Sequence, residues 1–164
     1  HEILHNWWGN SVFVDYATGN WCEGLTAYMA DHLIQEQRGT ADEYRRSALQ
    51  KYRDFVRTGR DFPLAEFRGR FSAASEAVGY GKALMLFHMT RRQIGDEAFK
   101  RGLQKFYREQ RGKRATFMDL ARAFSAVAET VAAMTSSATA PRTSRVWNGP
   151  KPIRPMPRLR RQPP

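Results

Sequence analysis

Residues 1–10 read HEILHNWWGN, and this stretch contains an H-E-x-x-H motif formed by His1, Glu2 and His5. In a helix, residues four apart lie on the same face, so His1 and His5 can present two imidazoles to one metal ion. Glu2 lies one position around the helix, where its carboxylate can hold and deprotonate a water molecule on that ion. We therefore expect a helix over residues 1–10 that carries two metal ligands and a general base. The alternative is a surface helix with two unrelated histidines and a solvated glutamate.

Two imidazoles and one carboxylate suit Zn²⁺, which keeps its fourth coordination position for water. Zinc lowers the pKa of that water to about 7, so that hydroxide is available as a nucleophile at neutral pH. The motif therefore predicts a zinc site with hydrolytic chemistry, in which Glu2 acts as general base on the zinc-activated water.

The residues that follow the motif resemble the membrane alanyl aminopeptidase family, a branch of the gluzincin zinc metallopeptidases. That family reads H-E-x-x-H-Q-W-F/W-G-N and continues, after a short connection, with Asn-Glu-Gly. In this chain Asn6 stands in the Gln place, WWGN follows at residues 7–10, and Glu23 with Gly24 stands in the Glu-Gly place. The resemblance implies that Glu23 is the third ligand beside the two motif histidines, with one Zn²⁺ per chain.

The connection from the motif to Glu23 departs from the family pattern in two ways. It is one residue shorter, and Cys22 replaces the Asn that precedes the Glu. A deletion inside the helix would rotate Glu23 by about 100° and carry it away from the metal. We therefore expect the loop to absorb the shorter spacing, so that His1, His5 and Glu23 still meet. The thiol of Cys22 is expected to serve packing rather than chemistry.

A second match, VGYGKALMLFHM at residues 78–89, resembles the Tyr-x-Lys-Gly helix entrance of the same family. The match implies that Tyr80 is the phenol that stabilises the tetrahedral oxyanion during peptide hydrolysis. Gly81 and Ala83 depart from the Glu and Gly that the family usually has at these places. The alternative for Tyr80 is an ordinary core tyrosine.

Helical spacing of apolar residues extends over most of the chain. It predicts four helices, over residues 21–37, 42–56, 77–93 and 96–110, and a fifth that Thr116 caps. We expect Gly39 to end the first helix, Asp96 to cap the fourth, and Asp119 to complete a capping box with Thr116. The inward face of the second helix is expected to comprise Tyr44, Leu49, Tyr52, Phe55 and Val56.

A third match covers residues 95–124, which resemble the helical segment that follows the tyrosine in the family, with its Gly-(Glu/Asp)-x-x-Phe and Thr-x-x-Asp-Leu elements. The three matches together cover roughly residues 1–128. The expected fold class is therefore mainly α, the helical lobe of a thermolysin-like (gluzincin) catalytic domain.

The net charge of +11 is concentrated at one end of the chain. Residues 141–164 hold seven Arg or Lys and no acid, which leaves 20 basic and 16 acidic groups before them. We expect residues 1–130 to form a partial catalytic domain and residues 131–164 a Pro- and Arg-rich disordered tail. The tail is open to three interpretations: an unnatural or frameshifted end, a linker, or an arm that binds nucleic acid or an acidic membrane. It has no recognition motif, so we expect no specific nucleic-acid partner.

Four further side chains are candidates for supporting roles. Asp15 could orient a zinc-bound imidazole, because carboxylates often do so at zinc sites. Glu76 could line the cleft. His32 and His88 are expected to be packing or hydrogen-bonded histidines rather than ligands.

The whole sequence points to a zinc-dependent metallopeptidase that acts on peptides. The resemblance alone implies an aminopeptidase, since the family's amine-binding Gly-x-Met-Glu-Asn segment is not among these residues. The alternative from another class is an inactive helical fragment with the same residues. No apolar run is long enough to span a bilayer. The chain begins with His1 rather than Met, so we expect it to be a piece of a longer protein, and its compartment stays open.

Overall fold

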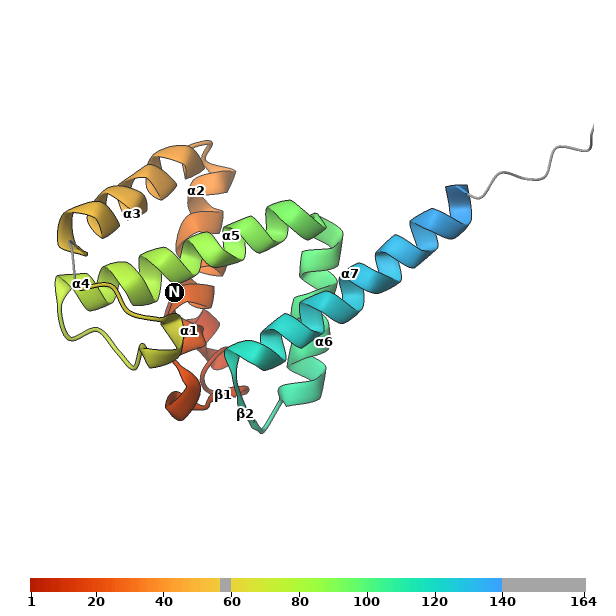
Figure 1. The fold of residues 1–164 in the computed structure, drawn as a ribbon, viewed down its shortest axis with the longest axis horizontal. Helices are drawn as coiled ribbons and strands as arrows, with labels where there is room; N and C mark the ends of the chain where they lie inside the picture. The colour runs from red at the N-terminus through yellow and green to blue at the C-terminus, as the bar shows by residue number, and fades with distance from the viewer. Residues whose placement is uncertain (57–59, 140–164) are drawn as a thin grey trace, which may run out of the picture.

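Helices dominate the computed structural model, which describes residues 1–56 and 60–139, with side chains up to residue 130 (Figure 1). The expected mainly α class is confirmed. The strands β1 (Phe13–Val14) and β2 (Arg114–Ala115) form a short parallel pair. This pair ties the N-terminal segment to the connection between the last two helices. None of the helices among the described residues combines the length and the apolar character of a membrane span.

The first long helix runs without a break through three segments, α1 (Trp21–Thr26), the π-helical η3 (Ala27–His32) and α2 (Leu33–Gln37). Asn20 caps it, because its side chain accepts a hydrogen bond from the backbone N–H of Cys22 at 3.1 Å. Gly39 follows the helix with a φ of 77°, a conformation that glycine adopts without strain. The predicted helix over residues 21–37 is therefore confirmed, although its π-helical interior was not predicted.

The second and third helices cover one side of this helix. They are α3 (Ala41–Phe55) and a continuous run of α4 (Ala73–Glu76), the π-helical η5 (Ala77–Lys82) and α5 (Ala83–Ile94). The third helix begins before residue 77, because Ser72 and Ser75 form a capping box there. The prediction for Leu49 and Phe55 was wrong, since they are 51% and 45% exposed. The apolar stripe of α3 is wider than the edge along which it packs on α2, α4 and η5.

The last two helices, α6 (Asp96–Gln110) and α7 (Phe117–Thr139), pack against each other. Asp96 does not cap α6, contrary to expectation, because its carboxylate accepts a hydrogen bond from Arg91 Nε at 2.8 Å. The capping box at the start of α7 is confirmed, since the side chains of Thr116 and Asp119 each accept from the other's backbone N–H. The helix α7 continues past the expected boundary at residue 130, and residues 140–164 of the expected tail lie outside the described part.

The H-E-x-x-H segment is not an α-helix, contrary to expectation. It forms one 3₁₀ turn, η1 (Leu4–Asn6), in which the N–H of Leu4 donates to His1 O at 3.0 Å and that of Trp7 to Leu4 O at 3.0 Å. Gly9 then takes a φ of 113°, which ends any helical continuation. His5 lies in the middle of this turn, and His1 accepts the hydrogen bond that precedes it.

Aromatic packing holds this turn in place. The Trp8 ring lies 6.4 Å from that of Trp21 and 6.0 Å from those of Phe106 and Tyr107, measured between ring centroids. Trp21 is fully buried and its indole N–H donates to Ala115 O at 2.7 Å. Contacts of this kind anchor the turn to α1, α6 and β2.

Candidate metal centre

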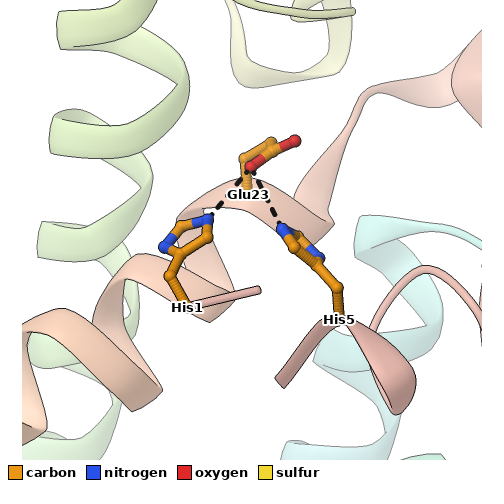
Figure 2. A group of neighbouring side chains, drawn as sticks. All are labelled: His1, His5 and Glu23. Atoms are coloured by element: carbon orange, nitrogen blue, oxygen red, sulfur yellow. Dashed lines mark hydrogen bonds and ion pairs between the residues drawn. The ribbon is translucent and has the colours of Figure 1, made fainter. Parts of the chain in front are cut away.

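Three potential ligands converge at the start of the chain (Figure 2). Glu23 Oε2 lies 3.4 Å from His1 Nε2 and 3.6 Å from His5 Nε2. One ligand atom from each side chain lies within 4.8 Å of the other two. Glu23 thus faces both histidines in spite of the shorter connection that precedes it.

The donor set fits a zinc ion. Zn–N and Zn–O bonds of about 2.0–2.1 Å at tetrahedral angles place neighbouring ligand atoms roughly 3.3 Å apart. The observed separations of 3.4 and 3.6 Å are close to this value. The three side chains keep exposures of 20%, 18% and 23%, so they face a solvent-accessible space rather than the closed core.

Close packing of two helices brings Glu23 beside Tyr80. A Cβ atom on Gly24 would lie 2.2 Å from Ala83 Cβ and 3.0 Å from Gly79 O, so only glycine allows this approach. Across the contact, the Tyr80 ring lies nearly parallel to the ring of His1, with centroids 6.1 Å apart. The contact between α1 and η5 therefore assembles one site from segments far apart in sequence.

All five residues predicted for the site line one cavity of about 680 Å³: His1, Glu2, His5, Glu23 and Tyr80. Glu2 is exposed, and within the described chain its carboxylate has no hydrogen bond or ion pair. Burial, and secondly the neighbouring Glu23 carboxylate, raise the pKa of the Tyr80 phenol above its ordinary value. Tyr80 is therefore a protonated hydrogen-bond donor at neutral pH.

Asp31, and not Asp15, is the carboxylate that orients an imidazole. Asp31 Oδ2 accepts a hydrogen bond from His1 Nδ1 at 2.9 Å, whereas Asp15 caps a short 3₁₀ turn by accepting from the N–H of Ala17 at 3.1 Å. The π-helical turn explains this, because one extra residue in a helix rotates the residues after it by about 100° around the helix axis. Asp31 therefore faces the site, where a regular α-helix would present Ala30.

The other wall of the cavity is charged. Lys51, Arg70 and Glu76 line it, and Glu76 lies 3.8 Å from Lys51 Nζ and 3.7 Å from Arg70 Nη1. Glu76 was expected at the cleft, whereas the two cations were not singled out, because their loops and helix faces look like ordinary solvated surface in the sequence.

His32 and His88 do not line this cavity. His32 is fully buried, and Arg45 Nη1 lies 2.7 Å from its Nε2 atom. Burial, followed by the Arg45 charge, lowers the pKa of His32 to about 4. His88 Nδ1 lies 3.4 Å from the phenol oxygen of Tyr28. Both therefore have the packing and hydrogen-bonding roles that were expected.

Comparison with known protein families gives one decisive match. Residues 1–138 match the model of the peptidase family M1 domain. The chain belongs to peptidase family M1. The resemblance noted in the sequence is thereby confirmed, and this M1 chain is part of a hydrolase family.

Two curated relatives of the M1 chain come from Saccharomyces cerevisiae, an alanine/arginine aminopeptidase and the mitochondrial aminopeptidase 2. Each is 24% identical over 113 residues, which cover 65% of this chain. The matched region is 13% and 12% of the length of these relatives, respectively. The search of solved structures gave no match.

Proposed function

We propose that this chain carries the metal-binding part of a zinc-dependent aminopeptidase, with His1, His5 and Glu23 as the zinc ligands. The observation that carries the proposal is the convergence of these three donors at zinc-like separations on a cavity that also receives Glu2 and Tyr80. Membership of family M1 supports the peptidase assignment.

The bound zinc ion would supply Lewis-acid activation of water. Glu2 is placed to take the proton from the attacking water, since its carboxylate is exposed and unpaired at the same cavity. The same carboxylate then passes a proton to the leaving amine. Tyr80 donates its phenolic hydrogen to the oxygen that gains negative charge in the transition state.

The proposed substrate is a peptide, which is cut after its N-terminal residue. The names of the two yeast relatives, both aminopeptidases, support this choice. The inactive helical fragment remains the rival, and the nucleic-acid alternative depends on the tail beyond the described residues.

Replacing Glu2 tests the proposed function. In the zinc-loaded protein we expect Glu2→Gln to lower kcat on alanyl and arginyl anilides by roughly 10²–10⁴-fold, because the general base is lost. The zinc content should stay the same, since Glu2 is not a ligand. Glu43→Gln is the matched control, because Glu43 is an exposed glutamate on α3 and does not line the cavity.

Unchanged hydrolysis by Glu2→Gln would contradict the proposal. Stoichiometric zinc without hydrolysis in the wild type would favour the inactive fragment.

A further inference from the structure

The thiol of Cys22 lies directly behind His5, on the side away from Glu23. Its Sγ atom is 3.2 Å from His5 Nδ1 and donates its hydrogen to Trp8 O at 2.9 Å. His5 Nδ1 donates to the same carbonyl oxygen, also at 2.9 Å. The thiol, the imidazole and the carbonyl therefore form a closed triangle of polar contacts.

The position of the thiol is fixed by its surroundings. Cys22 is 4% exposed, and the Asn20 side chain holds its backbone N–H at the start of α1. A Cβ atom on Gly9 would come within 3.2 Å of Cys22 Sγ, so the turn after the H-E-x-x-H motif closes over the sulfur. The sulfur has little room to move away from His5.

The carbonyl in this triangle determines which nitrogen of His5 carries the hydrogen. Trp8 O can only accept, and it has two lone pairs, so it can receive both the Nδ1–H and the S–H. The sulfur presents its own lone pairs to Nδ1–H as a second, weak acceptor. Nε2 is the nitrogen left free to bind a metal ion, and it lies 3.6 Å from Glu23 Oε2.

We propose that Cys22 is a positioning residue of the metal centre, which packs behind His5 and keeps Nε2 aimed at the metal while the Trp8 carbonyl holds the Nδ1–H. This inference rests on the proposed zinc site. His1 is oriented differently, because its Nδ1 donates to the Asp31 carboxylate at 2.9 Å. The two imidazoles are thus oriented by a carboxylate and by a thiol–carbonyl pair.

Zinc affinity measured by competition with a chromophoric chelator tests the proposal. We expect Cys22→Val, which keeps the volume and loses both polar contacts, to weaken zinc binding by about 10–100-fold. Cys22→Ser keeps a hydroxyl that can donate to Trp8 O, and should restore most of the affinity. Tyr28→Phe is the control on the same continuous helix, because Tyr28 is buried and its hydroxyl meets His88 and Arg91, away from the cavity.

A second measurement reports on His5 without any metal. The ¹⁵N chemical shift of His5 Nδ1 should be the same in the wild type and in Cys22→Ser, and should change in Cys22→Val, because the side chain behind this nitrogen then has no polar atom. Urea unfolding of the same variants separates this effect from a loss of stability. Wild-type zinc affinity and an unchanged Nδ1 chemical shift in Cys22→Val would overturn the proposal. If the wild type binds no zinc, the proposed function fails, and the Nδ1 chemical shift still decides whether Cys22 acts on His5.

Discussion

Asp31 and Asp15 carry the same charge but have different surroundings. Asp31 is partly buried and touches His1, and burial raises the pKa of its carboxyl group. Asp15 accepts an exposed hydrogen bond from the N–H of Ala17 and caps a 3₁₀ turn. A carboxylate behind a metal-binding imidazole fixes the ring and increases its basicity. Only Asp31 can act in this way.

Substitution of the two aspartates separates these roles. We expect Asp31→Asn to weaken zinc binding by about 10–100-fold, because the imidazole of His1 loses its charged acceptor. Asp15→Asn should leave zinc affinity unchanged, since an Asn caps a turn nearly as well as an Asp. Isothermal titration with Zn²⁺ measures both variants, and equal affinities for the two would contradict the assignment.

The motif residues could be predicted from the sequence, but their partners could not. His1, Glu2, His5, Glu23 and Tyr80 belong to short patterns whose spacing is visible in the chain. The contact of Asp31 with His1 depends on a π-helical turn, which leaves no mark on the apolar periodicity. The contact of Cys22 with His5 depends on the turn at Gly9, which replaced the expected helix.

At the scale of helices, the site depends on how closely α1 approaches η5. The capped ends at Asn20 and Thr116 were predictable, because capping is a local interaction between neighbouring residues. How closely two helices approach each other depends on residues that are far apart in the sequence. Gly24 permits the close approach, because a Cβ atom there would lie 3.0 Å from Gly79 O. Gly79 instead makes room for the Phe67 ring, from which a Cβ atom would lie 2.0 Å away.

Gly24→Ala should therefore damage both stability and metal binding. The new methyl group would lie 2.2 Å from Ala83 Cβ, and overpacking of this kind costs about 1–3 kcal/mol. The neighbouring Glu23 would move with the helix, so zinc affinity should fall as well. Gly81→Ala is the control, since its nearest neighbour would be Ala48 O at 3.6 Å.

Urea unfolding and zinc titration of both variants check this prediction. A Gly24→Ala chain with the stability and the zinc affinity of Gly81→Ala would show that the close approach of the helices is unimportant.

At the scale of the whole molecule, charged groups away from the site join three helices. Arg91 on α5 donates two hydrogen bonds of 2.9 Å to Glu36 on α2 and one of 2.8 Å to Asp96 on α6. These bonds to Arg91 are the largest cause that lowers the pKa of Glu36 and of Asp96. The buried His32 lies beside this network, with Arg45, Glu36, Tyr28, Tyr44 and His88 around it.

The fold should lose stability in acid in two stages. Between pH 6.5, the ordinary pKa of His32, and its folded value of about 4, the unfolded chain binds a proton that the folded chain does not. The free energy of unfolding decreases as the pH is lowered wherever the unfolded state holds more protons, here by about 3 kcal/mol at most. Below pH 4 the lowered pKa values of Glu36 and Asp96 extend the loss.

Urea unfolding from pH 7 to pH 3 measures this dependence. His32→Gln, whose amide can still accept a hydrogen bond from Arg45, should reduce the loss of stability between pH 6.5 and 4. The lowered pKa of His88 still contributes in this range, and the loss below pH 4 should remain. A wild-type free energy of unfolding that stays constant between pH 6.5 and 4 would contradict the assignment to His32.

The proposed metal centre would link the first turn of the chain to α1 through His1, His5 and Glu23. The direct test is the zinc content of the purified protein after equilibrium dialysis, measured by elemental analysis for the wild type, Glu23→Gln and Glu76→Gln. Glu76 lines the same cavity but lies outside the ligand group. We predict one zinc ion per chain for the wild type and for Glu76→Gln, and a loss of bound zinc for Glu23→Gln. A wild type without stoichiometric zinc, or a Glu23→Gln chain that keeps it, would contradict the account.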